Sequence, residues 1–212
     1  MTEHRIIATQ IELREQPNES LPAIRGYAVV WNARSVFLWG FYEEFAPRAF
    51  GDPIEGDIAA LWSHDAASVL GRTRNGTLQI SNDDTGVLFS ITPPDTQAGR
   101  DAVALIRRGD VDSMSFGFNT LPEGETWTIT DRNEPLRIVR AAQLVEVSPV
   151  AFPAYPATSA AVRAQPGEPV QIPAHILEQC RRQAATVTPP STDDEQRRRA
   201  SRQRLLQLGE RS

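Results

Sequence analysis

Two segments with alternating polar and apolar positions stand out along the chain. In the first, Val111–Phe118, Ser113 and Ser115 alternate with Met114 and Phe116. Successive side chains of a strand point to opposite faces. The pattern therefore predicts a strand that buries Met114 and Phe116 and presents two hydroxyl groups on its other face.

The second segment, Ala142–Val150, predicts the last strand of the domain. A regular alternation would put Leu144, Glu146 and Ser148 on one face, and the intervening valines on the other. Proline cannot donate to a strand ladder, so we expect regular structure to end at a group of prolines, namely Pro149, Pro153 and Pro156.

One helix has a full set of start and stop signals. Thr96 can cap its first turn, Arg107 and Arg108 complement the dipole of its last turn, and Gly109 ends it. An apolar stripe with helical spacing lies between these signals, formed by Ala98, Ala102, Leu105 and Ile106. The helix leads directly into the serine strand.

The other apolar runs are short and are separated by turn residues, a pattern typical of β-strands joined by turns. We expect a hairpin at the start of the domain, a short helix from Pro47 to Phe50, and a strand that ends at His64. The expected strands are Arg5–Leu13, Ala23–Trp31, Ile58–Ser63, Thr77–Ser81, Gly86–Thr92, Thr126–Thr130 and Leu136–Val139.

The character of the chain changes near residue 163. Residues 1–162 hold 13 Arg and 21 acidic residues, a charge of −8, whereas residues 163–212 hold 9 Arg and 6 acidic residues, a charge of +3. We therefore divide the chain into a domain of residues 1–163 and a linker with an Arg-rich tail at 164–212. Within the tail we expect a linker at 165–173, a helix at 174–185 and an Arg-rich helix at 195–208, ordered loosely or only with a partner.

Composition excludes several classes of function. The single cysteine, Cys180, excludes an intrachain disulfide and a thiolate metal cluster. No apolar run approaches the roughly 18 residues that span a bilayer, and the first residues lack a secretory signal, so we expect a cytoplasmic protein without a membrane partner. The acidic body disfavours nucleic acid as its ligand, because phosphate binding needs a concentrated positive face.

The residues that can carry chemistry are a serine and His64, the only histidine between residues 5 and 174. Ser115 can act as a nucleophile if His64 removes its proton. A carboxylate would orient the imidazole, and Glu146 is our choice. Periodicity leaves Ser113 open as the nucleophile and Asp65 as the acid. Metal chemistry is the poorer alternative, because His64 and Asp65 lack a second histidine at ligand spacing. We predict no metal and no cofactor.

An ordered series of motifs over residues 23–163 resembles the prohead proteases of tailed bacteriophages, which are capsid maturation serine proteases related in fold to herpesvirus assemblin. The motifs are Gly26-Tyr27-Ala28, Phe45-Ala46-Pro47-Arg48-Ala49-Phe50, Leu61-Trp62-Ser63-His64-Asp65 with Gly71-Arg72, Ser113-Met114-Ser115-Phe116-Gly117-Phe118, and Glu146-Val147-Ser148-Pro149-Val150 with Pro153-Ala154-Tyr155.

The resemblance implies an α+β fold built on a mainly antiparallel β-barrel, and a catalytic set of His64, Ser115 and Glu146. It also implies activity inside the assembling prohead in the host cytoplasm. The implied partners are the major capsid protein with its scaffolding segment, and the protease itself through autocleavage or self-association. Two departures from the family pattern are Arg48, where glycine is usual, and an apparent insertion at Glu123–Pro135, which lengthens the spacing from Ser115 to Glu146.

Two functions of other classes stay open. A catalytically silent scaffold component would use the domain only to recruit the tail. A nucleic-acid-binding accessory protein would act through Arg197–Arg204 of the Arg-rich tail.

Overall fold

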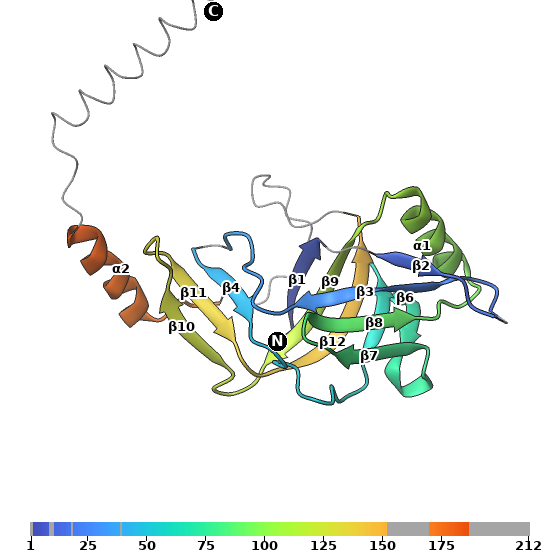
Figure 1. The fold of residues 1–212 in the computed structure, drawn as a ribbon, viewed down its shortest axis with the longest axis horizontal. Coiled ribbons are helices and arrows are strands. Elements are labelled where there is room, and N and C mark those ends of the chain that lie inside the picture. Colours follow the sequence, from blue (N-terminus) through green and yellow to red (C-terminus); the bar gives the residue numbers. More distant parts are fainter. Residues whose placement is uncertain (1, 9–10, 18, 39, 152–169, 187–212) are drawn as a thin grey trace, which may run out of the picture.

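The strands in the described part of the chain form three sheets (Figure 1). The computed structural model describes residues 2–8, 11–17, 19–38, 40–151 and 170–186. The elements are β1 (Glu3–Ala8), β2 (Glu12–Arg14), β3 (Ala23–Val30), β4 (Tyr42–Phe45), β5 (Ala59–Trp62), β6 (Asp65–Arg72), the 3-10 turn η1 (Thr73–Asn75), β7 (Leu78–Asn82), β8 (Gly86–Ile91), α1 (Gln97–Arg108), β9 (Ser113–Thr120), β10 (Glu125–Ile129), β11 (Pro135–Val139), β12 (Ala142–Val150) and α2 (Ala174–Thr186).

The largest sheet has the strand order β1-β9-β12-β5-β6 and carries all three predicted site residues. The serine strand β9 is the second strand of this sheet, antiparallel to both of its neighbours, β1 and β12. The other sheets have the orders β10-β11-β4 and β2-β3-β8-β7. Of the strand pairs that the structure describes, only β12–β5 and β11–β4 are parallel, which confirms the mainly antiparallel α+β prediction.

The predicted barrel is not confirmed, because the strands in the described part of the chain lie in three open sheets. The barrel expectation came from the family resemblance. Instead, the chain leaves the five-stranded sheet after β1, after β6 and again after β9 to build the smaller sheets. Each sheet is therefore left with two edge strands, namely β1 and β6, β2 and β7, and β10 and β4.

The hydrophobic core lies against the five-stranded sheet, here called the central sheet, on the face opposite to Ser113 and Ser115. Met114, Phe116 and Phe118 of β9 are at most 1% exposed, and they face away from Ser113 and Ser115 as the alternation predicts. Phe116 and Phe118 pack edge-to-face against Phe45 of β4. This aromatic packing anchors the back of the serine strand, so the strand presents its hydroxyl groups from a rigid base.

The helix α1 confirms the sequence prediction at both ends. The Thr96 side chain accepts a hydrogen bond from the Gly99 N–H, and Gly109 ends the helix with φ of +85°. The inner face of α1 buries Ala102, Val103 and Ile106 in the core.

The predicted helix at 174–185 is present as α2, which packs against β10 and β11 (Figure 1). Ile176 is buried in this contact, and Asn133 donates a hydrogen bond to the Cys180 carbonyl. The first part of the predicted tail is therefore docked on the domain rather than loosely attached. The predicted linker at 165–173 lies mostly outside the described residues, and the predicted helix at 195–208 lies entirely outside them.

Three local predictions were wrong. The segment Arg5–Leu13 forms two strands of different sheets, β1 and β2, and only β2 pairs with β3 in the expected hairpin. Residues 47–50 form turns instead of a helix, because Arg48 has a left-handed backbone with φ of +62°. Pro149 lies inside β12 rather than ending it. Pro153 and Pro156 lie outside the described residues.

The apparent insertion at 123–135 does not separate the site residues. Most of it forms β10 and the turn to β11. β10 pairs with β11, and β11 pairs with β4, so these three strands form a separate sheet. The chain then returns, and β12 pairs directly with β9 along Ser113–Thr120. The extra length is therefore absorbed outside the central sheet.

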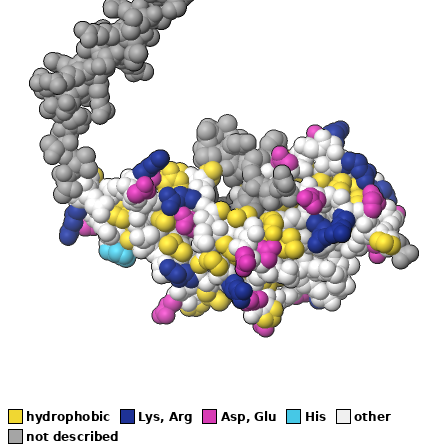
Figure 2. All heavy atoms as spheres, viewed as in Figure 1, with side chains coloured by type: hydrophobic (Ala, Val, Ile, Leu, Met, Phe, Trp, Pro, Cys, Tyr) yellow, Lys and Arg dark blue, Asp and Glu magenta, His cyan; other side chains and the backbone are white. Residues whose placement is uncertain are grey.

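The surface agrees with the acidic character of the body. On the face shown in Figure 2, Arg side chains are interspersed with acidic ones and form no continuous basic area among the described residues. None of the helices described is long and apolar enough to span a membrane.

Candidate active site

A β-bulge brings Glu146 to the face of the sheet that carries Ser115. The pairing of β12 with β9 shifts between Leu144 and Glu146, so that Leu144 lies opposite Phe118 and Glu146 opposite Gly117. Leu144 consequently packs in the core, whereas Glu146 and Ser148 lie with Ser115 on the other face. The predicted shared face of Leu144 and Glu146 was wrong, because a bulge inserts one residue and reverses the alternation.

His64 lies in the two-residue turn between β5 and β6, and both turn residues have left-handed backbone. The angle φ is +50° at Ser63 and +64° at His64. Such pairs of positive φ angles form the type I′ hairpin turn, which Asn and Gly usually occupy. A left-handed conformation costs a residue with a Cβ about 1–2 kcal/mol. The turn therefore holds His64 in a strained position.

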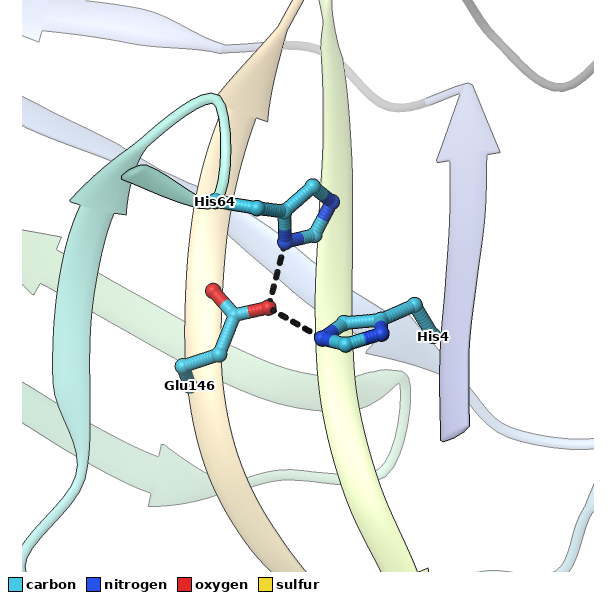
Figure 3. Close-up of side chains that lie close together, drawn as sticks. All are labelled: His4, His64 and Glu146. Carbon is cyan, nitrogen blue, oxygen red and sulfur yellow. Dashed lines mark hydrogen bonds and ion pairs between the residues drawn. The ribbon is translucent and has the colours of Figure 1, made fainter. Parts of the chain in front are cut away.

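Two hydrogen bonds fix this turn against β12. The Ser63 N–H donates to the Pro149 carbonyl at 3.3 Å, and the His64 N–H donates to the Ser148 hydroxyl oxygen at 3.3 Å. The imidazole of His64 then leans over β12 towards β9 (Figure 3).

The imidazole of His64 lies beside the carboxylate of Glu146, with Nδ1 2.6 Å from Oε1 (Figure 3). An ionised carboxylate can only accept hydrogen bonds. Nδ1 therefore carries the ring proton and donates a hydrogen bond to Glu146. In the neutral ring this leaves Nε2 unprotonated, so Nε2 is the atom that can act as a base.

The environment of Glu146 keeps its carboxyl group ionised. Burial raises its pKa, but hydrogen bonds from His4, His64 and Ser148, together with the charge of His64, lower the pKa to about 2. The Ser148 hydroxyl donates to Oε2 at 2.5 Å. Because Ser148 also accepts from the His64 backbone, it fixes the carboxylate and the turn relative to each other.

Ser115 lies on the same face but does not contact His64 directly in the described contacts. It pairs in register with Ser148, so the two Cα atoms are about 4.5–5.5 Å apart. Its side chain is fully buried, and its hydroxyl donates to the Arg5 carbonyl of β1 at 3.0 Å. The fold therefore brings His64 and Glu146 into contact and leaves Ser115 one strand away, turned towards β1.

The two alternatives from the sequence fit the geometry less well. Ser113 pairs with Val150, one step farther from Glu146 along the strands, and donates to its neighbour Asp112. Asp65 is exposed and accepts from the Ala67 N–H at 3.0 Å and the Ser68 hydroxyl at 2.7 Å. These local bonds lower the pKa of Asp65 and occupy its carboxylate away from the imidazole.

His4 is the residue of this site that the sequence analysis missed. Its Nε2 lies 3.4 Å from Oε1 of Glu146, and its ring lies edge-on to that of His64 with centroids 4.7 Å apart (Figure 3). His4 reaches the site because β1 pairs with β9, which sets His4 opposite Gly117. No local motif predicts such a pairing between residues that are more than one hundred positions apart.

Gly117 makes this close approach possible. A Cβ atom at this position would lie 3.0 Å from Cγ of Glu146 and 3.0 Å from Nε2 of His4. Both distances are shorter than an ordinary van der Waals contact, so a residue with a Cβ atom would displace at least one of these two side chains over β9.

A buried ionic network fixes β1, and with it His4 and the Arg5 carbonyl. Arg137 of β11 donates to Glu3 at 2.6 Å and to Glu43 at 2.7 Å, and Arg5 donates to Glu43 at 2.6 Å. Glu43 and Arg137 are nearly completely buried. Buried charges need such partners, so the network ties β1 to β4 and β11.

Comparison with known proteins identifies the family of the chain. No curated protein and no solved structure matches it. The family model described as caudovirus prohead serine protease matches residues 9–172, which include His64, Ser115 and Glu146 but not His4. This match confirms the resemblance found in the sequence and covers most of the 212 residues. The chain belongs to the caudovirus prohead serine protease family.

Proposed function

We propose that this protein is a serine endopeptidase of prohead maturation in which Ser115 is the nucleophile, His64 the general base and Glu146 the residue that orients the base. Family membership supports a serine peptidase with capsid proteins as partners. The observation that carries the assignment of residues is the contact of 2.6 Å between Nδ1 of His64 and Oε1 of Glu146.

Glu146 has two roles in this mechanism. It accepts a hydrogen bond from the Nδ1–H of His64, which keeps the proton of the neutral ring on Nδ1 and leaves Nε2 free to act as the base. It also stabilises the imidazolium that forms when Nε2 takes the serine proton. Its pKa of about 2 suits both roles, because the carboxylate then stays ionised throughout the reaction.

Attack requires Ser115 to leave its hydrogen bond with Arg5. A change between staggered rotamers, about 120° around χ1, turns the hydroxyl from β1 towards β12 and His64. His64 then removes the proton while Oγ attacks the peptide carbonyl, and Nε2 returns the proton to the leaving amine. Water releases the acyl group in the second half of the reaction. Because Ser115 is fully buried here, binding of the peptide must open the site.

The negative charge of the tetrahedral intermediate needs backbone N–H donors, each of which contributes about 10²–10³ in rate. We expect these donors in the segment from Ser148 to Ala154, which follows the strand of Glu146. Residues 152–154 of that segment lie outside the described residues.

The proposed substrates are the scaffolding segment of the major capsid protein and the protease's own residues 164–212, cleaved inside the prohead in the host cytoplasm. A fold related to herpesvirus assemblin belongs to the same proposal. The division into a protease domain at 1–163 and a tail at 164–212 also stays a prediction.

Co-expression with the capsid protein tests the assignment. The mass of every capsid-protein fragment is measured for the wild type, Ser115→Ala, His64→Ala and Ser113→Ala. We expect processing by the wild type and by Ser113→Ala, and loss of at least about 10³-fold in Ser115→Ala and His64→Ala.

Normal processing by Ser115→Ala would reject the serine mechanism and favour the silent scaffold component. Loss of processing in Ser113→Ala alone would move the nucleophile to Ser113. Circular dichroism of each purified variant separates a loss of chemistry from a loss of folding.

A further inference from the structure

Three groups that commonly bind zinc converge at the site although they come from three distant segments of the chain. One ligand atom from each of His4, His64 and Glu146 lies within 4.8 Å of the other two. Figure 3 shows both rings pointing a nitrogen at the same carboxylate oxygen. Proton transfer to a serine requires only one of these histidines, so the mechanism leaves His4 without a role.

The donor set and its spacing fit a zinc ion. Two histidines and one glutamate form a known three-ligand zinc set that leaves a fourth position open. With metal–ligand bonds of about 2.0–2.1 Å, tetrahedral donors lie about 3.3 Å apart. His4 Nε2 and Glu146 Oε1 are already 3.4 Å apart, and the 2.6 Å between His64 Nδ1 and Oε1 must widen by about 0.7 Å.

An ion can reach these three side chains from solvent, and a hydrogen bond from a neighbouring residue orients the carboxylate. The side chains of His4 and His64 are 24% and 30% exposed, whereas that of Glu146 is only 7% exposed. An ion can therefore approach from the histidine side. Ser148 holds the other carboxylate oxygen of Glu146 at 2.5 Å, a type of hydrogen bond that orients a metal-binding carboxylate.

We propose that Zn²⁺ binds His4, His64 and Glu146 and reversibly inhibits the protease. The inhibitory part rests on the proposed function, whereas the binding does not. Zinc coordinates the lone pair of Nδ1 of His64, so the proton of the neutral ring moves to Nε2. Nε2 is the nitrogen that must accept the proton of Ser115, and it cannot do so while it is protonated. Zinc also removes Glu146 from its role beside the imidazole.

Binding is measured first, by calorimetric titration of zinc chloride into the Ser115→Ala protein, which cannot digest itself. His4→Gln in the same background removes one ligand. His175→Gln is the matched control, because His175 is exposed on α2 and away from the central sheet. We expect one zinc ion per chain at this site, binding at least about tenfold weaker in His4→Gln, and unchanged affinity in His175→Gln. Equal affinity in the His4 variant and its parent would overturn the proposal.

Inhibition is measured next with the active protein and purified capsid protein, where zinc is added and then removed with a chelator. We expect processing to stop and to recover, and His4→Gln to need at least about tenfold more zinc for half inhibition of its own zinc-free rate. Stimulation by zinc, or binding without inhibition, would reject the inhibitory role. A chain that never processes but binds zinc through His4 would reject the proposed function and retain the metal site.

Discussion

Removal of the Ser148 hydroxyl tests whether the site is held together as described. Ser148→Ala deletes the bond of 2.5 Å to Oε2 of Glu146 and the acceptor of the His64 N–H at 3.3 Å. Ser148 and Glu146 are both buried, so water does not readily replace the lost donor. Hydrogen bonds to charged groups contribute about 1.5–3 kcal/mol. We therefore expect the variant to lose about 2–3 kcal/mol of unfolding free energy.

Ser113→Ala is the matched control for this experiment. Ser113 lies on the same sheet face and is equally buried, but its hydroxyl donates to Asp112, which is exposed and can turn to water. We expect this variant to lose only about 0.5–1 kcal/mol. Ser148→Thr keeps a hydroxyl on a β-branched side chain and should restore most of the stability lost in Ser148→Ala.

The assay is urea unfolding at neutral pH, with all variants in the Ser115→Ala background to prevent self-digestion. The free energies are compared at equal slopes, because a changed slope would indicate a changed unfolded state. Equal losses in Ser148→Ala and Ser113→Ala, within about 0.5 kcal/mol, would refute the argument that Ser148 holds the carboxylate.

Three further outcomes follow from the geometry. Gly117→Ala should lose about 1–3 kcal/mol of unfolding free energy and most capsid-protein processing, because its Cβ would lie 3.0 Å from both Glu146 and His4; unchanged processing would contradict this. Arg48→Gly should gain about 1 kcal/mol of unfolding free energy and raise Tm, because glycine adopts the φ of +62° at this position without steric penalty and the exposed ion pair of Arg48 with Asp52 contributes little. A lower Tm would show that the ion pair dominates. The pKa of Glu146 is lowered from 4.5 to about 2, so its ionisation stabilises the fold fully above pH 4.5, and this stability is lost as the pH falls towards 2. The difference in unfolding free energy between wild type and Glu146→Gln should therefore be constant near neutrality and shrink below pH 4.5, and a difference independent of pH would count against the cited shift.

The sequence predicted the elements whose signals are local. The caps of α1, the alternation in β9 and the bounds of β12 each depend on neighbouring residues, and all three are confirmed. The pairing of His64 with Glu146 was predicted from the residues and supported by the family resemblance, and their side chains do meet. Whether they are catalytic stays a prediction.

The features that the sequence did not predict depend on long-range pairing. The bulge beside Glu146 appears only when β12 is placed against β9, and a strict alternation gives the wrong partner in Leu144. His4 joins the site only because β1 crosses to the central sheet. The turn at Ser63 and His64 contains no glycine, so its left-handed backbone has no sequence signal.

The left-handed turn sets the stability of the fold against the proposed catalytic role of His64. Glycine at position 64 would adopt the observed φ of +64° without steric penalty, so a chain without the imidazole could be the more robust one. Selection for thermal resistance alone would push this position towards glycine and away from the histidine. A homologue with glycine at this position would then keep the fold, with greater stability, but lack the imidazole that the proposed peptidase activity requires.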